Sequence, residues 1–63
     1  MNIDDKVRVT SEHSRHDQVG TITQISMVHN KLGTTIVITV KFDSVDTNGY
    51  RQCGFDPTML KVI

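Results

Sequence analysis

The sequence lacks residues on which several kinds of function depend. It has one cysteine, no tryptophan, one tyrosine and two phenylalanines among 63 positions. The lone Cys53 cannot form a disulfide within the chain, and with no recognisable signal peptide this predicts a reducing, cytoplasmic setting. So few aromatic rings argue against a stacking platform for single-stranded nucleic acid. They also argue against a groove for proline-rich peptides.

A charge surplus and a long apolar run are missing as well. Seven basic residues balance seven acidic ones, and strong nonspecific binding to nucleic acid needs a basic surplus or a basic face. No apolar run approaches the length of a membrane span, so any contact with a membrane would go through a partner. The length predicts one domain over residues 1–63, and a domain of this size buries only about 60% of its unfolded surface.

The clearest pattern present is the alternation in Thr35–Phe42. Ile36, Ile38, Val40 and Phe42 fall on one face at period two, and polar or shorter residues alternate with them. This alternation of mostly β-branched residues predicts a strand with one buried face. Further strands are predicted at residues 6–10, 19–28, 50–55 and 60–63.

Local signals mark the irregular points of the chain. Gly20, at the start of the second strand, predicts a close backbone approach or a bulge. Apolar residues at positions 22 and 25 break period two, so a bulge is expected near residues 23–24. Asp56 followed by Pro57 predicts a capped helical turn. Five short strands with one helical turn before the last predict an all-β, five-stranded SH3-like barrel, with an OB-like barrel as the alternative.

One segment resembles a known family. Residues 40–50 read Val-Lys-Phe-Asp-Ser-Val-Asp-Thr-Asn-Gly-Tyr, which is similar to the Val-Arg-Phe-Asp-x-Val-Asn-x-Asn-Gly-Tyr/Phe segment of the SH3-like electron-transport accessory family, the family of photosystem I reaction-centre subunit IV. Asp5–Val9, Val19–Ile22 and the closing residues from Phe55 are similar too. The resemblance implies an SH3-like barrel that docks a protein partner, and Lys41 matches a basic position implicated in docking ferredoxin.

A looser resemblance links Lys6–Val9 and Val19–Ile22 to KOW-type barrels of transcription and translation factors. It implies a module that binds nucleic acid or the ribosome, and this is the alternative function.

Candidate partner-binding residues come from the polar loops and the outward faces of strands. They are Arg8, His13, Arg15, His16, Lys41, Tyr50 and Arg51. Lys6 and Arg8 share the outer face of one predicted strand, so they would converge with Lys41 if the strands pair. Such a cluster would steer an acidic protein or a phosphate backbone. An ordinary solvated face is the other interpretation of the same residues.

Catalytic and metal sites are not expected. His13 and His16 form one close pair, with His29 and Cys53 elsewhere, but no second close pair completes the four tetrahedral ligands that zinc usually takes. Cys53 with a histidine base would lack a third, orienting residue. The expected function is therefore a non-catalytic module, without cofactor, that docks an acidic or ferredoxin-like protein or a subunit of a membrane complex.

Overall fold

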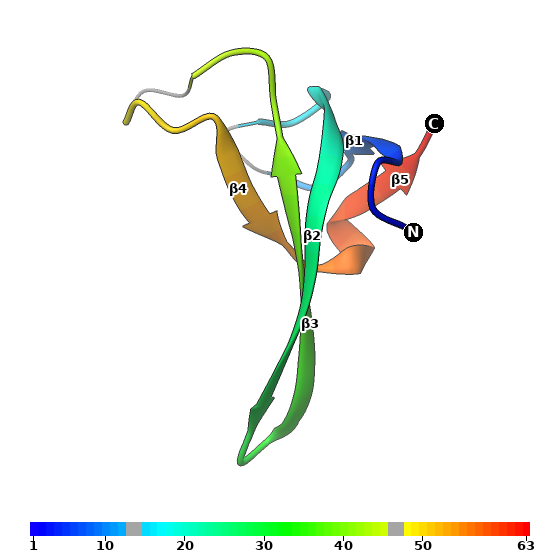
Figure 1. Cartoon of the computed structure of the whole chain (residues 1–63), viewed down its shortest axis with the longest axis vertical. Coiled ribbons are helices and arrows are strands. Elements are labelled where there is room, and N and C mark those ends of the chain that lie inside the picture. The colour runs from blue at the N-terminus through cyan, green and yellow to red at the C-terminus, as the bar shows by residue number, and fades with distance from the viewer. Residues whose placement is uncertain (13–14, 46–47) are drawn as a thin grey trace.

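The computed structural model describes residues 1–12, 15–45 and 48–63. Five strands form one antiparallel sheet in the order β4-β3-β2-β1-β5 (Figure 1). The strands are β1 (Lys6–Val9), β2 (Val19–Asn30), β3 (Gly33–Lys41), β4 (Gln52–Phe55) and β5 (Leu60–Val62). The 3₁₀ turn η1 (Pro57–Met59) connects the two edge strands, β4 and β5. The all-β class, the five strands and the helical turn before the last strand are confirmed.

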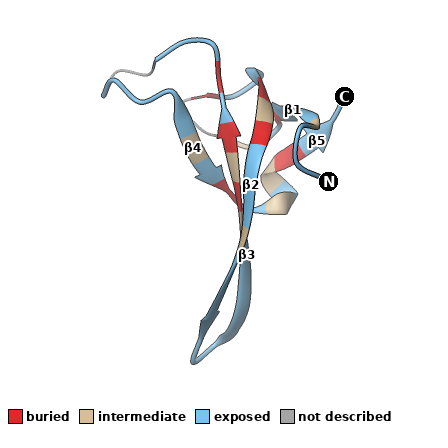
Figure 2. Ribbon diagram, in the orientation of Figure 1, coloured by how far each residue is buried: buried red, intermediate tan, exposed pale blue. Residues whose placement is uncertain are grey.

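A single apolar face of the sheet forms the core. Its buried members are Val7, Val9, Ile22, Ile38, Val40, Phe42, Phe55 and Leu60. Burial alternates along β1, as predicted for a strand with one face in the core and one face exposed to solvent. The rings of Phe42 and Phe55 meet edge to face at 6.1 Å between centroids. Figure 2 shows the buried positions gathered in the half of the sheet where all five strands lie.

The β2–β3 hairpin extends well beyond this core. β1 pairs with β2 only over Val19–Thr21, and β4 pairs with β3 only over Ile38–Lys41. Residues 24–37, called the arm below, therefore project as a two-stranded ribbon that ends in a two-residue turn (Figure 1). Ile36 lies on the arm and is 41% exposed. The prediction that Ile36 is buried with Ile38 is wrong, because among the described residues β1 and β4 pair with the hairpin only nearer the core and leave Ile36 partly open.

Two local predictions for β2 are confirmed. The register between β2 and β3 shifts between Ile22 and Gln24, which is the expected bulge. A side chain at Gly20 would place its Cβ 2.5 Å from Cγ1 of Val40 and 2.7 Å from the carbonyl oxygen of Lys41. Glycine at this position is what allows β2 to lie so close to β3.

The helical turn begins as the sequence predicts. The carboxylate of Asp56 accepts hydrogen bonds from the backbone N–H of Thr58 at 2.9 Å and from its hydroxyl at 2.8 Å. Pro57 occupies the first position of the turn. The backbone hydrogen bond and then the hydroxyl hydrogen bond lower the pKa of Asp56 below its ordinary value of 3.8.

Replacing Asp56 with alanine is expected to lower Tm near neutral pH and to lose that effect in acid. A carboxyl whose pKa is lowered by folding stabilises the fold above its unfolded pKa, and this stabilisation disappears as the pH falls through the folded pKa. Thermal melts across that range should therefore show the Tm difference between the two proteins shrinking below about pH 4. Asp56→Asn, which does not titrate, is the control. A difference that stays constant down to about pH 2 would contradict the role of the carboxylate.

Candidate functional site

Basic side chains converge on the outer face of the sheet. In β1, Val7 and Val9 point into the core, so Lys6 and Arg8 point outward. Lys6 pairs with Thr21 of β2, and Thr21 pairs in turn with Lys41 of β3. The two lysines thus occupy one row across the sheet, and their Cα atoms are about 10 Å apart because a single strand separates them.

A second row adds a residue that the sequence analysis did not single out. Arg8 lies directly opposite Lys61 of β5, and both side chains are exposed. Lys6, Arg8, Lys41 and Lys61, called the basic face below, come from three strands. Like charges placed directly opposite one another on a sheet are destabilising. An anionic group that binds between Arg8 and Lys61 would relieve this repulsion.

The basic face is not neutralised within the part of the chain that the structure describes. No carboxylate lies within salt-bridge distance of its four side chains there, and the one ion pair found joins His16 to Asp17 at 3.4 Å. Asp43 is an acidic residue that lies near two of these side chains. It borders a shallow hollow of about 100 Å³ that is also lined by Lys6, Val19, Gly20, Thr21 and Lys41. A second hollow of about 130 Å³ lies beside Arg8 and Lys61.

Arg15 does not lie on the surface, and the prediction that it is an exposed binding residue is wrong. Its side chain is 1% exposed, and its guanidinium stacks over the ring of Phe42 at 4.4 Å from the centroid. It donates hydrogen bonds to Oε1 of Gln18 at 2.9 Å and to the backbone carbonyl of Tyr50 at 2.7 Å. Arg15 therefore ties the loop after β1 to the loop before β4, and it cannot present its charge to a partner.

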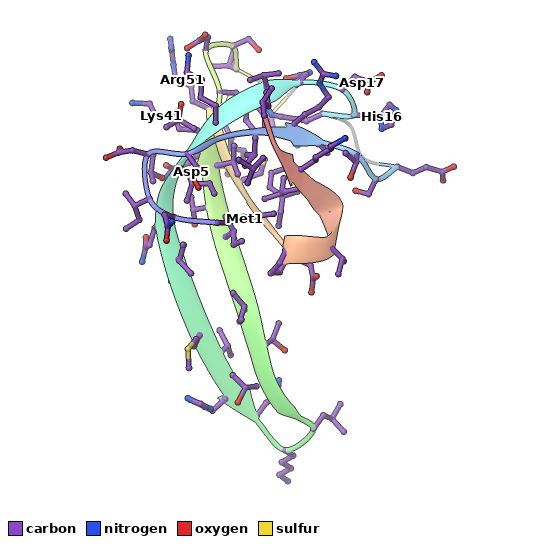
Figure 3. All side chains as sticks on the ribbon, turned by 90° about the vertical axis from the view of Figure 1, so that its right-hand side faces the viewer. Met1, Asp5, His16, Asp17, Lys41 and Arg51 are labelled. Carbon is purple, nitrogen blue, oxygen red and sulfur yellow. The ribbon has the colours of Figure 1, made fainter. Side chains whose placement is uncertain are left out.

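The other loop candidates lie in different places. Arg51 and Lys41 lie at the same end of the molecule, away from the arm (Figure 3). The Arg51 guanidinium makes a long hydrogen bond of 3.5 Å to the carbonyl of Asp43, and the Tyr50 side chain is exposed. His16 lies across the molecule from Lys41 (Figure 3), with Nδ1 2.8 Å from the Ser11 carbonyl oxygen. His13 falls outside the described residues. The structure thus adds Arg51, but not His16, to the neighbourhood of the basic face.

Residues considered for metal binding or catalysis lie apart. Cys53 is half-buried on β4, opposite Val40, and packs against the core. His29 lies far along the arm, with Nδ1 3.0 Å from the Thr34 hydroxyl. Among the described ranges, no three His, Cys, Asp or Glu side chains gather where one metal ion would contact them all. In the same ranges no helix is long and apolar enough to cross a membrane.

The contribution of Lys61 depends on a pairing that local patterns do not reveal. Leu60 is buried and Lys61 is exposed, as alternation in a short strand requires. Alternation alone does not indicate that β5 lies beside β1 and brings Lys61 opposite Arg8. A search for basic residues at outward positions of every predicted strand would have included it.

Comparisons with known proteins supply no relative from which to infer a role. No protein-family model matches the chain, and no curated protein or solved structure is significantly similar to it. A proposal for its function therefore depends on the chemistry of the basic face and of the residues around it.

Proposed function

We propose that this protein is a non-catalytic SH3-like barrel module that docks an acidic protein surface through the basic face. One observation carries the proposal: Arg8 and Lys61 are paired across two strands with no described carboxylate beside them. Folding must overcome the repulsion between these two cations, and an acidic partner would remove it. The resemblance to the electron-transport accessory family supports a ferredoxin-like protein as the type of partner.

The arrangement suits electrostatic steering. The four cations extend from three strands of one hydrogen-bonded sheet, so their backbone positions are fixed before a partner arrives. Complementary charge of this kind raises the association rate and selects orientation more than it raises affinity. Arg51, at the same end of the molecule as Lys41, extends the positive surface towards the loop before β4.

A protein partner fits better than nucleic acid because the positive surface is small and has a carboxylate at its border. Asp43 lines the same hollow as Lys6 and Lys41, and the whole chain carries no net charge. A long phosphate backbone would run from the basic face over such carboxylates, whereas a compact acidic patch would not. A KOW-like nucleic-acid module remains the second candidate, because the four cations lie across one sheet. It would show a salt dependence corresponding to about four phosphate contacts.

Charge reversal at Lys41 or Lys61 is expected to weaken binding of an acidic protein about tenfold each at low salt. Titration calorimetry with a ferredoxin as the acidic probe measures the change. Lys31→Glu is the matched control, because Lys31 is an exposed lysine at the tip of the arm, far from the basic face. The control should bind within about twofold of the wild type when moderate salt screens distant charges.

A duplex DNA titrated in parallel separates the two candidates. Tight ferredoxin binding with weak DNA binding supports protein docking. The reverse result, with a steep loss of affinity on adding salt, would favour the nucleic-acid module. Equal losses at Lys31, Lys41 and Lys61 would show that only overall charge matters, and the basic face would then not be the site.

A further inference from the structure

The arm carries an apolar surface that the rest of the described chain covers only in part, at the root of the arm. Met27 and Ile36 are cross-strand partners on the arm, and Ile25 is the partner of Ile38. These residues continue the core face of the sheet outward, and Met27 is 62% exposed. At the root of the arm lies a hollow of about 250 Å³ that is lined by Met1, Ile25, Ile36, Ile38 and Pro57. The core thus opens into an apolar surface along the arm.

Charge is almost absent from this part of the chain. Between Ile22 and Val40, Lys31 at the tip is the only Asp, Glu, Lys or Arg. Depletion of charged residues, with Met retained, is typical of the centre of a protein interface. An acidic or polyanionic partner would find one cation on the whole arm. A second copy of this chain, which carries no net charge and has the same charge-poor arm, meets no electrostatic barrier there.

The size of the exposed surface fits a dimer. The chain exposes 4583 Å², whereas a compact monomer of its mass exposes about 4,100 Å². Its radius of gyration is 11.6 Å, compared with about 10.6 Å for a compact chain of this length. The excess of about 500 Å² per chain, if two copies buried it, would reach the roughly 1,000 Å² that a specific interface requires.

The edges of the arm also lack protection against association. The N-terminal segment covers β2 as far as Ile22, whose N–H and C=O bond Asp5 and Asp4. Beyond Ile22, the two-residue turn makes Asn30 and Gly33 a hydrogen-bonded pair, and hydrogen-bonded and non-hydrogen-bonded pairs then alternate along the hairpin. Ile25, Met27 and His29 fall in non-hydrogen-bonded pairs, so their N–H and C=O groups point away from β3, towards the open edge of β2. From Gln24 to Asn30 this edge has no proline and no charged side chain. Proteins that remain monomeric usually protect an edge strand with a proline or a charged side chain.

We propose that the arm is a homodimerisation element. Two copies pack arm to arm about a two-fold axis, and Met27 of each chain enters the apolar hollow at the root of the other arm. A two-fold contact uses the same surface on both copies, so one apolar surface is enough to close the assembly. The basic face lies on the opposite side of the sheet from the core and the apolar side of the arm, so the dimer presents two basic faces and leaves both open.

Analytical ultracentrifugation of the full chain tests the proposal, over about 1 μM to about 1 mM. The expected species has twice the 7.1 kDa mass of the chain. Met27→Asp should raise the dimer dissociation constant at least about a hundredfold, because each dimer would bury two new carboxylates. Val45→Asp is the matched control, since Val45 is 52% exposed but lies outside the arm, and it should dimerise like the wild type.

Circular dichroism and thermal melts, recorded on monomeric samples, establish that the variants are folded. Ile36→Asp provides a second disruption on the partner strand of the arm and should also give monomers. The proposal is overturned if the wild type stays monomeric throughout the concentration range. It is equally overturned if a folded Met27→Asp variant dimerises as well as Val45→Asp does.

Discussion

Replacing Arg15 with alanine is expected to lower the free energy of unfolding by about 3 kcal/mol. The guanidinium donates to Gln18 and to the carbonyl of Tyr50, and it covers the ring of Phe42. Hydrogen bonds from a charged donor contribute about 1.5–3 kcal/mol each, and a desolvated cation–π contact contributes about 2 kcal/mol. A domain of this length has a total stability of only about 3–9 kcal/mol. The alanine variant is therefore expected to lose between about a third and nearly all of this stability.

Urea denaturation followed by circular dichroism measures this effect. Arg15→Lys should retain roughly half of the lost stability, because lysine keeps the charge but not the planar fork that reaches two acceptors. Arg51→Ala is the matched control: Arg51 lies in the neighbouring loop, is exposed, and makes a long hydrogen bond. The Arg51→Ala substitution should lower the free energy of unfolding by less than about 0.5 kcal/mol. If Arg15→Ala lost no more stability than Arg51→Ala, the buried guanidinium would not hold the two loops together.

Replacing Gly20 with alanine is expected to lower the free energy of unfolding by about 2 kcal/mol. The added methyl would sit 2.5 Å from Cγ1 of Val40 and 2.7 Å from the Lys41 carbonyl oxygen. The oxygen belongs to the backbone of β3 and Val40 is fully buried, so relieving the clash requires β3 to shift or the Val40 side chain to repack. Thr21→Ala, at the next residue, changes an outward side chain and should cost less than about 1 kcal/mol.

A double-mutant cycle identifies the cause. In Gly20→Ala combined with Val40→Ala, the branched side chain that blocks the new methyl is gone. The loss in free energy of unfolding should then be smaller than the sum of the two single losses, by about 1 kcal/mol. Additive losses would mean that the clash with Val40 is not the reason for glycine at position 20.

Features set by neighbouring residues could be predicted from the sequence. The alternation in β1 depends on adjacent side chains, and so does the bulge after Ile22, because each fixes which face a residue occupies. The Asp56 cap likewise involves atoms only two residues apart. Such patterns determine local geometry in the same way in any fold, and for this reason they predicted the strands and the helical turn.

Features set by residues far apart in the sequence could not be predicted in this way. Arg15 is buried because Phe42 and Tyr50, far along the chain, surround its side chain, and a polar loop sequence contains no sign of this. Period two correctly placed Ile36 on the core face, but it does not say where the covering strands end. Of the candidate site, the convergence of Lys6 with Lys41 could be anticipated, whereas the opposition of Arg8 and Lys61 required the order of the strands.

The pairing of β1 with β5 has a consequence for the folding reaction. Val7 pairs with Val62, near the other end of the described sequence, so β1 gains its second neighbour only when almost the whole chain has been brought together. Contacts of such long sequence separation carry a large loop-closure entropy and slow the search for the native state. Formation of β1–β5 is therefore expected to be a late event, and a chain paused before it would still have the edge of β1 open.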